Sequence, residues 1–320
     1  MVHPTIIKQL TDHGISFIAA FRLYDPVSWH LLEIELDKLK RRGTRCIIDY
    51  SSENYNDEVL VAYDKFVDYG LDFVILSHDP SHHLVKPNIV FWPYWLHWSQ
   101  ERLTFPGFNT SNIRKYPIAS MARYPRTHRI LNYLRLKEKH YFDSNVITIH
   151  QVNDVAPISR PDDVVLPQND QLIWQLIQGT LPKIPKLSFS VIHPGYTDSY
   201  INLIVETTAN TGFFISEKTW QPIASGQLFL IWGSKGSIEH LRTMGVDVFD
   251  DIIDHKYYDS EEDPYKRLDK IHQVLDQLVT LDLANVYDRT LERRLSNSAK
   301  FHNNEFNQIY LNDLTNVSTR

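Results

Sequence analysis

The sequence is poor in cysteine and glycine. Cys46 is the only cysteine among 320 residues, which excludes an internal disulfide and a zinc site built from cysteines. A reducing, cytoplasmic location is the simplest interpretation, and for a viral protein this means the host cytoplasm. The eleven glycines form neither a G-x-x-x-x-G-K-[ST] phosphate loop nor a G-x-G-x-x-G fingerprint. ATPase-type and nicotinamide-dependent functions therefore lose their best sequence support.

Other chemical signatures are also absent. No apolar run reaches the roughly 18 residues that a spanning helix needs, so we expect no membrane span. The G-x-S-x-G, H-E-x-x-H and D-x-D patterns do not occur, which disfavours hydrolase elbows and two kinds of metal site. His78, His82 and His83 with Asp79 could bind a metal, but a polar turn after a strand is the simpler interpretation. The sequence therefore predicts no metal and no cofactor.

Charge is distributed unevenly along the chain. The formal net charge is -6, which argues against a protein that coats nucleic acid over its whole surface. Residues 114–139 hold eight Lys or Arg and one acid, whereas residues 247–263 hold eight acids and one Lys. This asymmetry favours a local anion site over a general polyanion binder.

Short apolar runs alternate with helical patterns, which predicts βαβ units and parallel sheets. In the first third, strands are expected at 15–21, 45–50, 72–78 and 88–94, with helices at 26–42 and 57–69. An irregular linker is expected at 95–120. Afterwards we expect a helix at 127–140, strands at 146–150, 199–207 and 228–233, and mostly helix from 264.

The predicted fold class is α/β, with two Rossmann-like domains facing a cleft and a helical C-terminus. An N-terminal acceptor-side domain is expected at 1–115 and a nucleotide-sugar donor domain at 116–285. A helical segment at 286–320 would then pack back on the N-terminal domain.

Two segments carry the residues of an anion site. Arg123, Arg126 and Arg129 are spaced three apart at the expected start of a helix that Thr127 would cap. Arginine forks beside a positive helix end can hold a diphosphate, although a solvated basic helix face is the plainer alternative.

The second segment is SEKTWQPIASG. Ser216 is a plausible N-cap, and Glu217 and Lys218 begin the helix. Lysine opposes the helix dipole there, which makes sense if it meets a bound anion. Glu206, ten residues upstream, ends an apolar strand.

These residues carry a resemblance. The stretch YINLIVET…FFISEKTWQPIASGQLFLIWGS…LRTMGVDVFDD, within residues 199–259, resembles the donor domain of GT-B glycosyltransferases. It is most similar to the family 10 fucosyltransferase-like proteins and more loosely to exostosin-like ones. ARYPRTHR and IIDYSSEN resemble two further family segments. Gln227-Leu228 stands where fucosyltransferases usually carry a nearby proline.

The resemblance implies an inverting, metal-independent transfer from a nucleotide sugar, UDP- or GDP-linked, to a hydroxyl acceptor. Glu217 would contact the ribose, with Glu206 near the sugar or nucleotide. Lys218 and Arg126 would neutralise the diphosphate, assisted by Arg123 or Arg129. The base would come from the N-terminal half, with Glu53 favoured over Asp49 and with Asp25 and Asp79 as fallbacks.

Alternatives remain at this stage. A saccharide acceptor is favoured, but hydroxymethylated bases of viral DNA are a second possibility, and a non-catalytic nucleotide-sugar-binding module is a third. The aromatic loop 91–98, with Trp92, Trp95 and Trp98, can stack on a sugar or base or pack at a domain junction.

Overall fold

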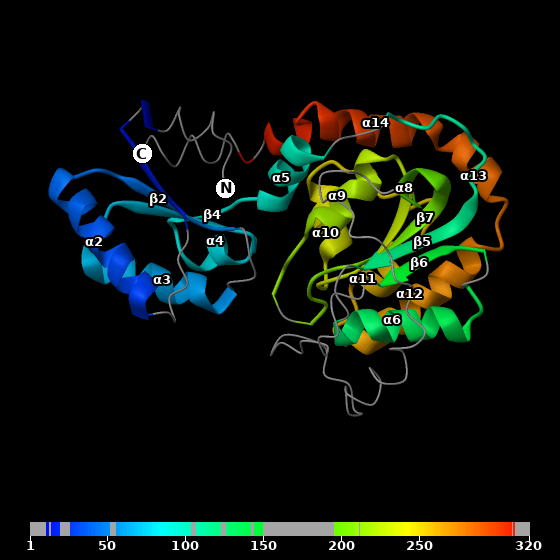
Figure 1. The fold of residues 1–320 in the computed structure, drawn as a ribbon, viewed down its shortest axis with the longest axis horizontal. Helices are drawn as coiled ribbons and strands as arrows, with labels where there is room; N and C mark the ends of the chain where they lie inside the picture. Colours follow the sequence, from blue (N-terminus) through cyan, green and yellow to red (C-terminus); the bar gives the residue numbers. More distant parts are fainter. Residues whose placement is uncertain are drawn as a thin grey trace. The chain divides into compact units, whose positions relative to one another are not determined.

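The chain forms two compact units, described separately below (Figure 1). Unit 1 comprises Met1–Trp98 and Asn307–Arg320, and unit 2 comprises Ser99–Phe306. This computed structural model describes residues 11–12, 14–19, 26–51, 56–103, 107–122, 126–141, 144–149, 195–210, 212–308 and 310. No helix in these ranges is long and apolar enough to cross a membrane.

Unit 1 contains a four-stranded parallel sheet in the order β1-β2-β3-β4. Its elements are β1 Ser16–Ala19, α2 Pro26–Arg42, β2 Cys46–Tyr50, α3 Asn56–Tyr69, β3 Phe73–Ser77, α4 His82–Val85, β4 Ile89–Phe91 and the start of α5 Tyr94–Arg102. Both faces of the sheet are buried, as parallel strands require. Ile48 and Tyr50 pack with Leu36 and Phe66 of the helices, while Ile47 packs on the opposite face.

Unit 2 contains a second parallel sheet, in the order β6-β5-β7-β8. Its elements are β5 Tyr116–Ala122, α6 Thr127–Glu138, β6 Val146–Ile149, α8 Gly195–Asp198, β7 Ser199–Val205, α9 Glu217–Ala224, β8 Leu228–Trp232, α10 Ser237–Thr243, α11 His255–Asp259, α12 Pro264–Leu278, α13 Leu283–Arg289, α14 Leu291–His302 and η1 Glu305–Asn307. The predicted α/β class with parallel sheets is thus confirmed.

The predicted irregular linker at 95–120 is wrong at both ends. Helix α5 begins at Tyr94, and β5 begins at Tyr116 and lies between β6 and β7. Pro117 and the small residues of YPIASMA hide this strand, because proline lacks a ladder donor and alanine and serine give little apolar signal. The sequence predicts a domain boundary near residue 115, whereas the two units divide within α5, between Trp98 and Ser99.

The C-terminal helix α14 packs against α9. Ser298 Oγ donates to the carbonyl of Ala224 at 2.7 Å, and Arg294 Nη1 donates to the carbonyl of Gly226 at 3.0 Å. Trp220 of α9 stacks on Phe301 with ring centroids 6.5 Å apart. Residues 286–306 therefore belong to unit 2, where they fix the C-terminal end of α9.

We expect Gly226→Ala to destabilise the protein by about 3 kcal/mol. Gly226 has φ +63°, and an added Cβ would overlap the ring of Phe108, so backbone strain and overpacking add together. Gly236→Ala is the matched control, because φ is +77° but no atom lies within 4 Å of the added Cβ; about 1 kcal/mol is expected there. Urea unfolding of both variants measures the difference, and equal losses would contradict the role of Phe108.

Candidate functional site

The strand order of unit 2 identifies one place for a ligand. From β5 the chain passes through α6 to β6 on one side, whereas β7 leads through α9 to β8 on the other. Right-handed crossovers in opposite directions place α6 and α9 on opposite faces of the sheet, as Figure 1 shows. In open α/β sheets ligands bind at such a switch point, beyond the carboxyl ends of the strands. The order in unit 1 is sequential and has no such reversal among its described strands.

Glu206 follows β7 at this point and is fully buried. Its Oε1 accepts hydrogen bonds from Ser216 N at 3.0 Å and Thr219 Oγ1 at 2.7 Å. Its Oε2 accepts from Thr207 N at 3.1 Å and Ser216 Oγ at 2.5 Å. Four donors saturate the carboxylate, so Glu206 positions the start of α9 and does not itself offer an oxygen to a ligand.

Lys218 lies beside this anchor, with its side chain 13% exposed. Its Nζ donates to Ser216 Oγ at 2.7 Å and Thr207 Oγ1 at 3.2 Å. Glu217 Oε1 lies 3.4 Å from Nζ, and Glu206 Oε2 lies 3.8 Å away. Ser216 is the N-cap of α9 and accepts from Lys218 N, which confirms the predicted cap. Lys218 is thus held at the helix start by hydroxyl groups that an anion can replace.

The start of α6 is tied to the end of β7. Arg126 Nη1 donates to the carbonyl of Thr207 at 2.7 Å. His128 Nε2 donates to the carbonyl of Glu206 at 2.9 Å, and Arg129 Nη2 reaches the same oxygen at 3.4 Å. Burial, followed by the positive charge of Arg129, holds the pKa of His128 well below its usual range, so its ring is neutral at pH 7.

The structure brings five of the six predicted donor-site residues together. Glu206 and Arg129 are buried and position the others, whereas Glu217, Lys218 and Arg126 are partly exposed. Arg123 lies outside the described residues. The predicted cap at Thr127 is wrong, because the extended residue Arg126 occupies the N-cap position without a side-chain bond. The three partly exposed residues are the groups that can meet a ligand.

Arg267 was not predicted, yet it fixes the loops around the site. Its guanidinium is buried and donates to the carbonyls of Ala209 at 3.1 Å, Gly233 at 2.5 Å, Glu261 at 2.8 Å and Glu262 at 3.1 Å. These carbonyls belong to the segments that follow β7 and β8 and precede α12. The sequence does carry a signal: Arg267 lies four residues before buried Ile271 and so on the apolar face of α12.

In unit 1 the described acid candidates are Asp49, on β2, and Asp79, which follows β3. The carboxyl of Asp49 is buried, and its Oδ1 accepts from Ser51 N at 2.9 Å and Ser51 Oγ at 2.5 Å. Burial raises the pKa of this carboxyl. Asp79 is buried and caps the next turn by accepting from Ser81 N at 2.8 Å. Glu53 and Asp25 lie outside the described residues.

The aromatic loop and the possible metal cluster of unit 1 were the other candidates from the sequence. Trp92 is fully buried and stacks on His97 with ring centroids 4.3 Å apart, so it cannot serve as an exposed stacking platform. Trp95 and Trp98 are half-buried and contact each other edge to face. Across the described ranges, no group of three or more His, Cys, Asp or Glu could hold a metal ion.

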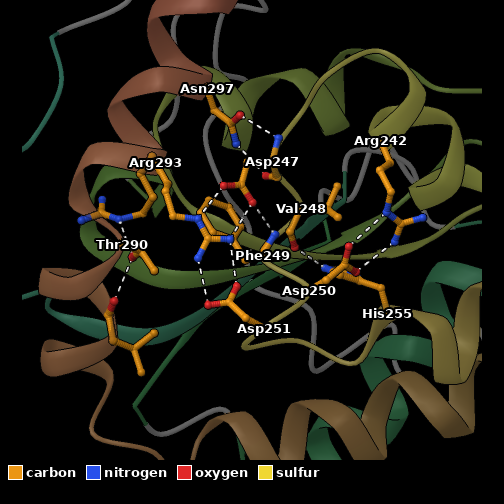
Figure 2. A network of polar contacts seen from close by, with 12 residues as sticks. Arg242, Asp247, Val248, Phe249, Asp250, Asp251, His255, Thr290, Arg293 and Asn297 are labelled. Carbon is orange, nitrogen blue, oxygen red and sulfur yellow. Dashed lines mark hydrogen bonds and ion pairs between the residues drawn. The ribbon is translucent and has the colours of Figure 1, made fainter.

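The acidic run 247–263 is used within the fold. Figure 2 shows Arg293 between Asp247 and Asp251, and Arg242 beside Asp250. The other five acids also have partners: Asp254 and Asp263 cap α11 and α12, Asp259 accepts from Ile238 N and Glu239 N, and Glu261 and Glu262 pair with Lys270 and Lys235. The run therefore stabilises the segments around α10, α11 and α14 and forms no free acidic patch.

We expect the free energy of unfolding to fall as the pH drops from about 6.5 to about 4. Burial lowers the pKa of His78, His255 and His272 to about 4. As the pH falls, these histidines are therefore protonated in the unfolded chain at a higher pH than in the folded chain. Their stabilising contribution is complete above the unfolded pKa and is lost as the pH falls through the folded pKa. Asp49 and Asp259, whose pKa values are raised by burial, act in the opposite direction.

His255→Gln isolates one of these groups. His255 Nε2 donates to the carbonyl of Val248 at 2.7 Å (Figure 2), and a glutamine amide can also donate but does not titrate. Urea unfolding of the variant over this pH range should show a shallower dependence than the wild type. An unchanged slope would mean that the pKa of His255 does not differ between the folded and the unfolded protein.

Comparison with known proteins adds one finding. No protein-family model matches the chain, and no curated protein matches it. Among solved structures, the chain is similar to a DNA-modifying β-glucosyltransferase determined with and without its substrate uridine diphosphoglucose. The identity is 11%, the TM-score is 0.37, and the match covers 97% of this chain and 83% of that chain. Likeness at this level transfers neither donor nor acceptor.

Proposed function

We propose that this protein is a glycosyltransferase that binds a nucleotide-sugar donor where α6 and α9 begin. One observation carries the proposal: Arg126, Lys218 and Glu217 meet at two helix N-termini at the switch point of the sheet of unit 2. The dipoles of both helices and two cationic side chains favour a diphosphate there. The arrangement needs no glycine-rich loop.

The partly exposed donor-site residues would contact different parts of the nucleotide. Lys218 exchanges its hydroxyl partners for phosphate oxygens, and the guanidinium of Arg126, which bonds to the carbonyl of Thr207, supplies a second positive charge. Glu217 accepts hydrogen bonds from the ribose. Glu206, His128 and Arg129 hold these groups in place through the end of β7. UDP- and GDP-sugars are the donors that we propose.

The reaction is an inverting displacement. A base takes the proton of the acceptor hydroxyl, the oxygen attacks the anomeric carbon, and the nucleoside diphosphate leaves with the electron pair of the broken C–O bond. Asp49 is the residue of unit 1 that we propose as the base. Ser51 orients its Oδ1, and its Oδ2 accepts no hydrogen bond from any described residue and so can accept a proton. Its raised pKa makes it a stronger base than an exposed aspartate. Glu53 is the second candidate.

A saccharide is the acceptor class that we favour. DNA binding needs unpaired cations along a surface, whereas Arg135 and Lys139 in the basic segment pair with Asp269 and Asp276. Arg114 is buried and donates to the carbonyl of Asn109. The basic segment therefore offers less to DNA than its composition indicated.

A panel of UDP-, GDP-, ADP- and CMP-sugars tests the proposal. The donor should raise the unfolding free energy by about 2.7 kcal/mol at 100 times its dissociation constant. Incubation of that donor with saccharide acceptors should then release nucleoside diphosphate. Absence of stabilisation by every nucleotide sugar would overturn the function, and binding without turnover would leave a non-catalytic module.

A further inference from the structure

Thr207 is a partly exposed threonine of the proposed donor site that the sequence did not single out. It directly follows Glu206, after the end of β7. Its carbonyl accepts a hydrogen bond from Arg126 Nη1 at 2.7 Å, and its Oγ1 accepts one from Lys218 Nζ at 3.2 Å. Its N–H donates to Glu206 Oε2 at 3.1 Å and so holds the residue in place. Thr207 therefore contacts both cations that we assign to the diphosphate.

These contacts restrict where a bound phosphate can lie. A phosphate that binds to Arg126 and Lys218 together needs an oxygen within about 3 Å of each cationic group. Both cationic groups already lie at hydrogen-bonding distance from Thr207. A phosphate held by the two cations therefore lies beside this threonine.

The hydroxyl of Thr207 can donate a hydrogen bond to such a ligand. A hydroxyl accepts through its lone pairs and donates through its proton. Oγ1 accepts from Lys218, but it donates to no residue in the described part of the chain. Ser216 Oγ, the other hydroxyl that accepts from Lys218, donates to Glu206 Oε2 at 2.5 Å. Of these two hydroxyls, that of Thr207 can bind a ligand without breaking a bond that anchors α9.

We propose that the hydroxyl of Thr207 binds a phosphate oxygen of the donor, between Arg126 and Lys218. Lys218 Nζ moves from Oγ1 to the phosphate, and Oγ1 donates its proton to an oxygen of the same phosphate. This hydrogen bond is charge-assisted, because its acceptor is an anion. The inference rests on the proposed nucleotide-sugar function and adds a phosphate-binding residue to that site.

Calorimetric titration of UDP, GDP and pyrophosphate into wild-type protein and Thr207→Val tests this inference. Valine has the shape of threonine but lacks the hydroxyl. For pyrophosphate and for the nucleotide that binds, affinity should fall about tenfold, the lower end of the range for a hydrogen bond to a charged group. Thr207→Ser keeps the hydroxyl and should bind within about threefold of the wild type.

Thr243→Val is the matched control. Thr243 is exposed on α10, and its Oγ1 donates to the carbonyl of His240 at 2.7 Å, so this variant should bind like the wild type. Unchanged affinity in Thr207→Val overturns the inference, and so does an equal loss in Thr243→Val.

Two further results would also overturn the inference. A loss that Thr207→Ser shares would show that packing matters and the hydroxyl does not. A loss for the nucleotide that pyrophosphate does not share would place the contact on the ribose or the base. If the wild type binds neither nucleotide nor pyrophosphate, the proposed function itself fails, and that outcome is distinct from a silent Thr207→Val.

Discussion

Lys218→Ala is expected to weaken nucleoside diphosphate binding about 10- to 100-fold and to lower turnover by about 100- to 1,000-fold. The lost charge-assisted bonds to phosphate are worth about 1.5–3 kcal/mol in binding. Turnover loses more, because negative charge grows on the leaving diphosphate in the transition state. Titration calorimetry and single-turnover assays measure the two effects separately.

Two variants control this prediction. Lys235→Ala removes a lysine after β8 that pairs with exposed Glu262, so binding and turnover should stay within about twofold, as for other exposed pairs. Lys218→Arg keeps the charge and should recover part of the binding. If Lys218→Ala turned over substrate as fast as the wild type, the diphosphate would not bind at the start of α9.

Glu206→Gln is expected to destabilise the protein by about 3 kcal/mol although the two side chains have the same shape. Backbone N–H groups point at both oxygens, with Ser216 N on Oε1 and Thr207 N on Oε2. Whichever way the amide is turned, its NH2 group faces a backbone donor and one buried N–H loses its acceptor. Urea unfolding measures the loss.

The same substitution should also weaken nucleotide binding, because Glu206 holds Ser216 and Thr219 at the start of α9. Glu262→Gln serves as the control, since that acid is exposed and its loss should cost less than about 1 kcal/mol. A Glu206→Gln variant as stable as the wild type would show that the carboxylate is not the anchor of this helix.

Local sequence signals predicted much of the fold. Strands buried on both faces leave unbroken apolar runs, as in CIIDY and LFLIW, and both stand where they were expected. The serine before Glu217 caps α9 as predicted, because an N-cap needs only its own short segment. Strand β5 lies between β6 and β7, and it was missed because Pro117 and the small residues of YPIASMA give little strand signal.

The candidate site was located by sequence, but the division of roles within it was not. A carboxylate at a strand end can bind a ligand or anchor a loop, and only the four donors around Glu206 decide between these roles. Arg126 and Arg129 look equivalent in sequence, yet Arg129 is buried against the end of β7. Likewise, the sequence gives no role to the acidic run, because partners such as Arg293 lie far along the chain.

Titration of UDP and GDP, and of the matching monophosphates, into wild-type protein in the presence of EDTA tests the proposed donor site most directly. Lys218 and Arg126 at two helix starts should engage both phosphates without a metal. One diphosphate is therefore expected to bind at least about tenfold more tightly than its monophosphate. A diphosphate that binds no more tightly than its monophosphate, or that binds only after a divalent metal is restored, would contradict the assignment.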